Sequence, residues 1–345
     1  MIKNFTISWR YTSLIIGLLL VFAAYKFAAD LLLNNVKDAN KKASYVYIKS
    51  NQSFDRLMFN LKKDEILKNP ESFERVAKLL DISDKIKPGR YKIEYGLSNL
   101  DIIKILKSGS QEPLNLVVKY AKRKENLALA LSKQLELDSA SLLNIINDSN
   151  TLKKAKMDEN NIISLFVPNT YNIYWNITGQ KLIERMIKEY NTFWNVNRTT
   201  KSILMKLSLQ QVATLASIVM SETNKIDEMP IVARVYLNRI EKGMALQADP
   251  TVLFALNDST IKRVLSIHLA FNSPYNTYLN SGLPPGPICM ASPEAIDAVL
   301  NAPLHNYLYF CAKDDLSGYH NFAETFAQHQ LNARKYQQEL NRRGY

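Results

Sequence analysis

Cysteine, histidine, glycine and proline are all scarce in this chain of 345 residues. With only 12 prolines and 10 glycines, the composition argues against long disordered stretches. Cys289 and Cys311 are the only cysteines. Outside the cytoplasm they could form a disulfide, although two separate small hydrophobic side chains are favoured. Only four histidines are present and no cysteine or carboxylate stands at ligand spacing, so the sequence predicts neither a metal site nor a cofactor.

Acidic residues are fewer than basic ones, which gives a formal net charge of +12 at pH 7. A basic protein suits an acidic membrane surface or a substrate that carries carboxylates, and it would also suit nucleic acid. The lysines and arginines are scattered rather than clustered, and we find no nucleic-acid-binding motif, so nucleic acid is not an expected partner. Internal repeats and low-complexity segments are also missing from the sequence.

Near the N-terminus, basic residues precede an uninterrupted apolar run from Leu14 to Ala24. The segment Tyr11–Ala29 has about the length that spans a bilayer, for which roughly 20 residues are needed. A cleaved signal peptide is the alternative, because small residues follow the apolar core. A cytoplasmic tail over residues 1–10 followed by a transmembrane anchor over residues 11–33 is the other interpretation of this pattern.

Beyond the anchor, residues 43–112 show the pattern of a small α/β unit. Short β-type runs stand at Tyr45–Ile48 and at the end of Lys87–Ile93, where a Pro-Gly turn leads into the strand. Ser53 and Ser98 are placed to cap helices, since each precedes apolar residues at helical spacing. Strand and helix patterns continue beyond this unit, so the fold class is α+β, with helices predominant.

The most informative segment is an apolar helix predicted after Ser208, with a single carboxylate, Glu222, at its far end. Ser208 and Gln211 have the spacing of a capping box. A predicted buried stripe follows, formed by Val212, Leu215, Ala216 and Val219, and Glu222 stands at its edge. Desolvation there would raise the pKa of the glutamate toward the value that a general acid needs. A helix-end glutamate turned toward solvent is the alternative interpretation.

A second helix is expected after Asp227, its predicted cap, with Pro230 in the first turn and Gly243 at the end. The segments that follow are polar and rich in proline, glycine and aromatic residues. Such segments are not needed to fill a core, and binding and catalytic groups concentrate in loops of this kind. They cover residues 246–252, 273–278, 282–288, 307–310 and 320–329.

The ordered motifs "LASIV..ET", "NR...GM.LQ.DPTV", "YNTY..GLPPGPI", "YLYF" and "H.F..T...H" resemble the YceG-like family over roughly residues 115–340. Members of that family are membrane-bound endolytic murein (peptidoglycan) transglycosylases. The resemblance implies cleavage of the β-1,4 bond between N-acetylmuramic acid and N-acetylglucosamine within a strand, leaving a 1,6-anhydromuramic end. It also implies a LysM-like module over residues 43–112 and a catalytic domain over residues 113–345, held outside the cytoplasm by an uncleaved anchor in the cytoplasmic (inner) membrane.

The resemblance points to Glu222 as the catalytic residue. Many relatives carry two glutamates in this helix, two residues apart, and this chain has Met220 at the first position and Glu222 at the second. One carboxylate suffices for a lytic transglycosylase, because the nucleophile is the C6 hydroxyl of the sugar itself. A two-carboxylate muramidase using Glu228 is one alternative. A non-catalytic peptidoglycan-binding scaffold is another, which Met220 favours. Relatives often have Asp in place of Asn169, and a turn-forming structural role fits that position.

Substrate contacts are expected from side chains in and around these motifs. Tyr275, Asn276 and Tyr278 have the composition of a sugar platform, although aromatic clusters more often belong to a core. Asp249 with Pro250 could instead build a turn, and Glu228 could be a helix-start carboxylate. Peptidoglycan strands, inner-membrane lipid and peptidoglycan synthases are the expected partners. The predicted substrate-binding residues are Glu228, Asn238, Arg239, Gln247, Asp249, Thr251, Tyr275, Asn276, Tyr278, His320, Phe322, Thr325 and His329.

Overall fold

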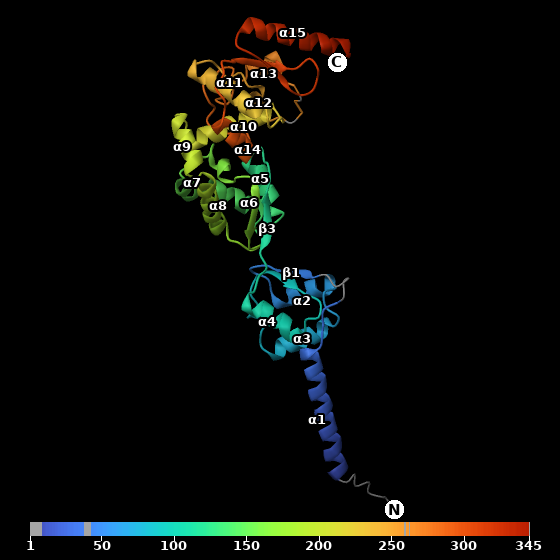
Figure 1. The fold of residues 1–345 in the computed structure, drawn as a ribbon. Helices are drawn as coiled ribbons and strands as arrows, with labels where there is room; N and C mark the ends of the chain where they lie inside the picture. Colours follow the sequence, from blue (N-terminus) through green and yellow to red (C-terminus); the bar gives the residue numbers. More distant parts are fainter. Residues whose placement is uncertain (1–8, 38–42, 259, 262, 345) are drawn as a thin grey trace, which may run out of the picture. The chain divides into compact units, whose positions relative to one another are not determined.

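The computed structural model describes residues 9–37, 43–258, 260–261 and 263–344 (Figure 1). The fold is a helix-rich mixed α+β fold, as the sequence predicts. Within the described residues, the strands pair as three two-stranded sheets, β1–β2, β3–β4 and β5–β6. The chain divides into two compact units. Unit 1 comprises Met1–Asn115 and Asn172–Ile177, and unit 2 comprises Leu116–Tyr171 and Thr178–Tyr345.

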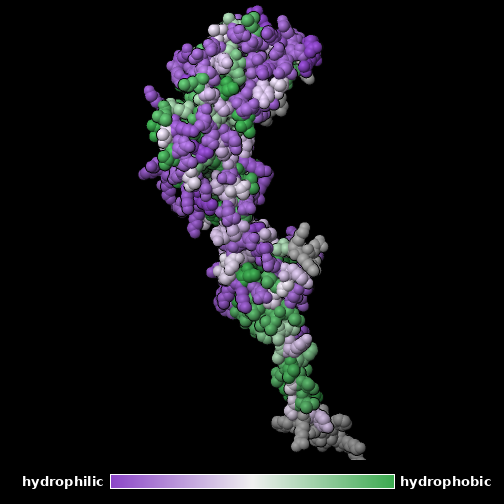
Figure 2. Space-filling view, viewed as in Figure 1, coloured by the Kyte–Doolittle hydropathy of each residue, from purple (hydrophilic) through white to green (hydrophobic). Residues whose placement is uncertain are grey.

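Unit 1 begins with the long apolar helix α1 (Trp9–Leu32). Its segment Tyr11–Leu32 is long and apolar enough to cross a membrane, and none of its hydrophobic window is buried within the protein. Figure 2 shows the surface of this helix as mostly hydrophobic. The helix is consistent with a single-pass membrane anchor at the predicted place. The predicted tail over residues 1–10 lies outside the described residues, apart from the first two residues of α1.

The remainder of unit 1 packs helices against a small sheet, as the sequence pattern predicts. The antiparallel strands pair Val46 with Tyr91, and both side chains lie in the core with Phe73. Ser53 and Ser98 cap their helices, and Ser98 forms a capping box with Asp101. That residues 43–112 form a LysM-like module stays a prediction. The elements are β1 (Ser44–Ile48), α2 (Phe54–Lys63), α3 (Pro70–Leu79), β2 (Gly89–Ile93) and α4 (Asn99–Ser108).

A buried polar cluster joins the end of α1 to the rest of unit 1. The Asn35 side-chain amide donates to the Asn99 amide oxygen at 2.6 Å and to the Ser72 hydroxyl at 3.2 Å. The Asn99 amide in turn donates to the carbonyl oxygen of Asp30 in α1 at 2.7 Å. Arg75 of α3 forms an ion pair with the Asp30 carboxylate at 2.7 Å. These contacts hold α1 against α3 and α4, because an unmade bond here would leave a buried polar group unpaired.

Unit 2 is built around α10, which packs against α9, α11, α12 and α14 (Figure 1). All residues from Val212 to Val219 are buried, so the predicted stripe was too narrow: neighbouring helices cover this helix on several sides. The elements before α10 are β3 (Leu114–Val118), α5 (Lys124–Ser132), α6 (Ser139–Asn147), α7 (Ser149–Ala155), the 3₁₀ turn η1 (Ile162–Leu165), β4 (Asn169–Ile173), α8 (Gly179–Phe193) and α9 (Val196–Leu204). Those that follow are α10 (Leu209–Glu222), α11 (Met229–Glu241), α12 (Asp249–Leu256), α13 (Ser266–Leu269), α14 (Pro293–Leu300), β5 (Tyr309–Ala312), β6 (His320–Ala323) and α15 (Phe326–Arg342).

The structure of unit 2 confirms some of the predicted helix starts and contradicts others. The Ser208–Gln211 capping box opens α10 as predicted. Asp227 is not the cap of α11, because Glu228 holds that position without a side-chain capping bond. Asp249 and Pro250 start α12 rather than building a turn, since proline in the first helical turn requires no N–H partner. The Asn169 amide oxygen accepts from the N–H of Thr170, which agrees with a structural role.

Candidate active site

Glu222 is the last residue of α10, and a hydroxyl from the next helix binds it directly. The Tyr236 hydroxyl of α11 donates to Glu222 Oε1 at 2.7 Å. The first half of α10 is fixed by its capping box and its middle by burial, so the position of this last turn is well defined. The carboxylate therefore lies where two packed helices meet, and not on a loop.

Burial raises the pKa of Glu222 to about 7. The Tyr236 hydrogen bond opposes this rise, the negative charge of Asp249 adds to it, and the positive charge of Arg239 opposes it. Burial disfavours the charged form of a carboxyl group, whereas a donated hydrogen bond favours it. With a pKa near 7, the protonated and ionised forms are both populated at neutral pH. This state is the one a general acid and base requires.

Tyr236 is a site residue that the sequence did not reveal. It lies within the second predicted helix, and its 14-residue separation from Glu222 matches no local pattern. The residue is 1% exposed, and its ring packs edge to face on Phe310 with centroids 5.8 Å apart. Burial, and then the charge of Glu222, raise the pKa of this phenol well above its ordinary value of 10.0, so it remains a hydrogen donor.

Asn238 and Arg239 tie α11 to the chain around it. The Asn238 amide donates to the carbonyl oxygens of His305 and Tyr307, at 2.8 and 2.9 Å. The Arg239 guanidinium donates to the carbonyl oxygens of Leu308 and Leu246, at 2.7 and 2.6 Å. Both side chains are buried, and burial lowers the pKa of Arg239. These hydrogen bonds fix α11 to the backbone of the neighbouring segments. Direct contact of Asn238 or Arg239 with substrate stays a prediction.

The predicted sugar platform, Tyr275, Asn276 and Tyr278, lies next to Asp249 and includes both accessible and fully buried side chains. Asp249 is exposed and accepts from the Tyr278 hydroxyl at 2.6 Å. Tyr275 packs against Phe254, with ring centroids 4.8 Å apart. Asn276 is fully buried, and its amide donates to the carbonyl oxygens of Leu269, at the end of α13, and Phe271. The amide expected to meet an N-acetyl group is therefore occupied in holding its own loop together.

Gln247 and Thr251 lie on either side of Asp249 in the sequence, and one is exposed whereas the other is buried. Gln247 is exposed and has a left-handed backbone, with φ of +51°. Thr251 is fully buried, and its hydroxyl lies 2.9 Å from that of Thr277. Thr251 thus fastens the start of α12 to the loop at 273–278, whereas Gln247 presents its side chain to solvent.

Glu228 is engaged by the β5–β6 hairpin. Its two carboxylate oxygens accept from the backbone N–H of His320 at 2.7 Å and pair with His320 Nδ1 at 2.8 Å. The Thr223 hydroxyl donates to it at 3.4 Å. The residue is 5% exposed. Glu228 therefore fastens β6 to the start of α11, and its geometry is that of a supporting group.

The remaining predicted residues surround this hairpin. Phe322 stacks on Tyr307 with centroids 5.7 Å apart, and Thr325 caps α15 through the N–H of Gln328. His329 stacks on Tyr309 at 5.5 Å, and burial, followed by the charge of Arg239, lowers its pKa. In the described part of the chain, no group of three or more metal-ligating side chains could hold an ion.

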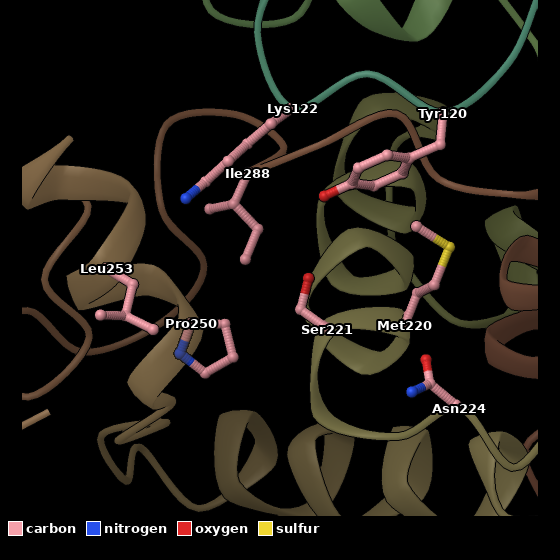
Figure 3. A pocket seen from close by; sticks show the side chains of 8 residues that line it. All are labelled: Tyr120, Lys122, Met220, Ser221, Asn224, Pro250, Leu253 and Ile288. Atoms are coloured by element: carbon pink, nitrogen blue, oxygen red, sulfur yellow. The ribbon is translucent and has the colours of Figure 1, made fainter. Parts of the chain in front are cut away.

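A cavity of about 540 Å³ lies beside the last turn of α10 (Figure 3). Met220 and Ser221, which immediately precede Glu222, form one wall, and Pro250, which follows Asp249, belongs to another. Tyr120, Lys122, Asn224, Leu253 and Ile288 complete the lining. A smaller cavity of about 210 Å³ shares Lys122 and is also lined by Phe254 and Tyr275. The sequence marked Met220 and Tyr275 but gave no reason to include Lys122.

Comparison with known proteins gives consistent matches. The model of the YceG-like family matches residues 46–335. The chain is 30% identical over 336 residues to the endolytic murein transglycosylase of Bacillus subtilis (strain 168), covering 92% of this chain and 91% of that protein. It is 27% identical to the endolytic murein transglycosylase of Streptococcus pneumoniae serotype 2 (strain D39), covering 84% of this chain but only 58% of that protein. A crystal structure of a YceG-like protein from Listeria monocytogenes is similar with a TM-score of 0.53 and 25% identity, over 84% of this chain and 99% of that one.

Proposed function

This chain belongs to the YceG-like family, and from that premise we propose that it is an endolytic murein transglycosylase. The proposed reaction breaks the β-1,4 bond between N-acetylmuramic acid and N-acetylglucosamine within a nascent peptidoglycan strand. Its product is a 1,6-anhydromuramic end, so the enzyme is a lyase that acts on a polysaccharide. Relatives with the name endolytic murein transglycosylase support the general activity, and the geometry around Glu222 supports the mechanism.

One observation carries the mechanism: the Glu222 carboxyl group has a pKa of about 7, and the two residues that precede it in α10 line the cavity of about 540 Å³. In the first step, the protonated Glu222 gives its proton to the glycosidic oxygen as the bond from C1 to that oxygen breaks. In the second step, the ionised Glu222 takes the proton of the C6 hydroxyl while the C6 oxygen bonds to C1. The glutamate ends the cycle protonated, and no water is consumed.

The neutral hydroxyl bound to the acid suits a one-carboxylate mechanism. The Tyr236 hydroxyl donates to Glu222 and stabilises its ionised form between the two steps. Glu228 is held by His320 in the hairpin, which argues against its use as a second catalytic carboxylate. The intramolecular nucleophile comes already positioned by the substrate, an advantage worth up to roughly 7–11 kcal/mol of barrier.

Mass spectrometry of the products from uncrosslinked peptidoglycan strands tests this function. The full chain in detergent is compared with Glu222→Gln and Glu228→Gln. We expect anhydro ends, one water lighter than reducing ends, which disappear in Glu222→Gln and persist in a folded Glu228→Gln. Reducing ends that vanish in either variant would show a two-carboxylate muramidase, and strand binding without any cleavage would show a scaffold.

We also propose that α1 anchors the chain in the cytoplasmic membrane with unit 2 on the outer side. The length and exposed apolar surface of α1 support this, and the substrate lies on that side. Membrane lipid and peptidoglycan synthases are then the expected neighbours, and residues 43–112 are proposed to contact glycan. Protease accessibility in sealed inverted vesicles checks the orientation, since only a chain with unit 2 enclosed would be protected.

A further inference from the structure

A lysine without a partner faces the cavity beside Glu222. Lys122 is exposed, and its amine is directed to the cavity (Figure 3). Within the described residues we find no hydrogen bond or ion pair for this ammonium group. The next two cations are committed elsewhere. Arg123 donates to the carbonyl oxygen of Phe254 and covers its ring, and Lys124 donates to Asn147.

The rest of the lining is neutral. It offers two hydroxyls and one amide, from Tyr120, Ser221 and Asn224. Its other walls are apolar and come from Met220, Pro250, Leu253 and Ile288. One cation against apolar walls, with no acidic side chain among the lining residues, is complementary to a ligand that joins a carboxylate to an apolar segment. A neutral sugar ring could accept hydrogen bonds from the ammonium group but would supply no opposite charge.

On the premise of the proposed function, the position of this cavity next to the last turn of α10 indicates which ligand it binds. N-acetylmuramic acid carries a lactyl ether to which the stem peptide is attached, and this peptide bears free carboxylates. Met220 and Ser221 of the lining immediately precede Glu222 in α10, so the cavity adjoins the helical turn that carries the proposed acid. We propose that the cavity receives the stem peptide and that Lys122 pairs with one of its carboxylates. Lys122 then determines specificity for peptide-bearing strands over bare glycan.

The test compares two substrates for each variant of the full chain in detergent. One is uncrosslinked peptidoglycan strands with their stem peptides, and the other is the same strands after an amidase has removed the peptides. The measured quantity is the ratio of kcat/KM for peptide-bearing strands to that for bare strands. Lys122→Met is expected to lower this ratio about tenfold, the effect of losing one charge-assisted hydrogen bond. Lys122→Arg keeps the charge and is expected to preserve most of the ratio.

Lys119→Met is the matched control, because it removes the same charge from the same exposed segment without touching the cavity. Its ratio should equal that of the unmodified chain. Strands whose peptide carboxylates have been amidated supply a second control, and Lys122→Met should have no further effect on them. A ratio that is unchanged in Lys122→Met overturns the proposal. If both kcat/KM values fall together, the cavity holds a sugar instead.

The inference and the proposed function fail in different ways. Absence of anhydro ends from every substrate would refute the function alone. Equilibrium binding of peptide-bearing and bare strands to Glu222→Gln, with and without Lys122→Met, then tests the cavity separately. Preferential binding of peptide-bearing strands that Lys122→Met removes supports the proposal. Equal binding of both kinds of strand overturns it.

Discussion

Replacing Tyr236 by phenylalanine tests the electrostatic account of Glu222 directly. The substitution removes the hydroxyl that donates to Glu222 at 2.7 Å but keeps the ring that packs on Phe310. A hydrogen bond to a charged group contributes about 1.5–3 kcal/mol, and about 1.4 kcal/mol corresponds to one pH unit. Because this bond favours the ionised carboxylate, its loss should raise the pKa of Glu222 by about 1–2 pH units.

The assay is the pH dependence of kcat/KM for the release of anhydro ends. In the unmodified chain, activity should fall as pH rises through about 7, because Glu222 loses the proton that it must donate. In Tyr236→Phe, this alkaline limb should move upward by about 1–2 pH units. A limb that stays in place, or moves downward, would refute the assignment of Glu222 as the acid with Tyr236 as its donor.

Tyr278→Phe is the matched control for this experiment. It removes a similar hydroxyl, which donates to the Asp249 carboxylate at 2.6 Å and not to Glu222. Asp249 itself is unchanged in this variant, so its effect on Glu222 is retained. The alkaline limb should therefore shift by no more than a few tenths of a pH unit, whatever happens to the maximal rate.

Three further predictions concern stability. Burial raises the pKa of Glu222 from its ordinary value of 4.5 to about 7. Between these values the native state holds a proton that the unfolded state has released, so stability should fall with rising pH by about 3 kcal/mol, and Glu222→Gln should abolish this loss. Hydrogen exchange of the α10 amides at pH 4.5 and 8 measures the difference, and parallel profiles would contradict it. Glu228→Gln should lower stability by about 1–3 kcal/mol by disturbing the bonds to His320, while anhydro products persist. Loss of product from a folded variant would assign Glu228 to the chemistry. Asn35→Ala should destabilise unit 1 by about 1–3 kcal/mol, because the Asn99 oxygen loses its donor. Faster hydrogen exchange at the start of α4 is the expected sign, and unchanged exchange would contradict the role of the cluster.

Features that depend on nearby residues in the sequence were predicted well. The caps at Ser53, Ser98 and Ser208 join groups three residues apart, so the sequence itself contains both partners. The desolvation of Glu222 also followed from its place at the edge of an apolar stripe. Asp227 failed as a cap because its neighbour Glu228 holds that position, where the β5–β6 hairpin engages it through His320.

Features that depend on distant partners were not predictable from residue type. Asn276 and Thr251 have polar side chains suited to binding sugar, yet the structure uses both to fasten loops. The side-chain chemistry that binds a glycan also satisfies a buried backbone, and only the fold decides between these uses. Tyr236 and Lys122 show the converse, since packing between separate elements brings Tyr236 to Glu222 and brings Lys122 to the cavity that Met220 and Ser221 also line.

The two steps of the proposed reaction make opposite demands on one carboxyl group. The first step requires a proton on Glu222 and is favoured by burial, which raises its pKa; the second requires an ionised carboxylate that can accept a proton. A fully apolar pocket would serve the first step and impair the second. The Tyr236 hydroxyl moderates this conflict, because it supplies a fixed donor that stabilises the ionised form without carrying a charge of its own. A lysine in place of that tyrosine would instead lower the pKa of Glu222, leaving too little of the protonated form at neutral pH to begin the cycle.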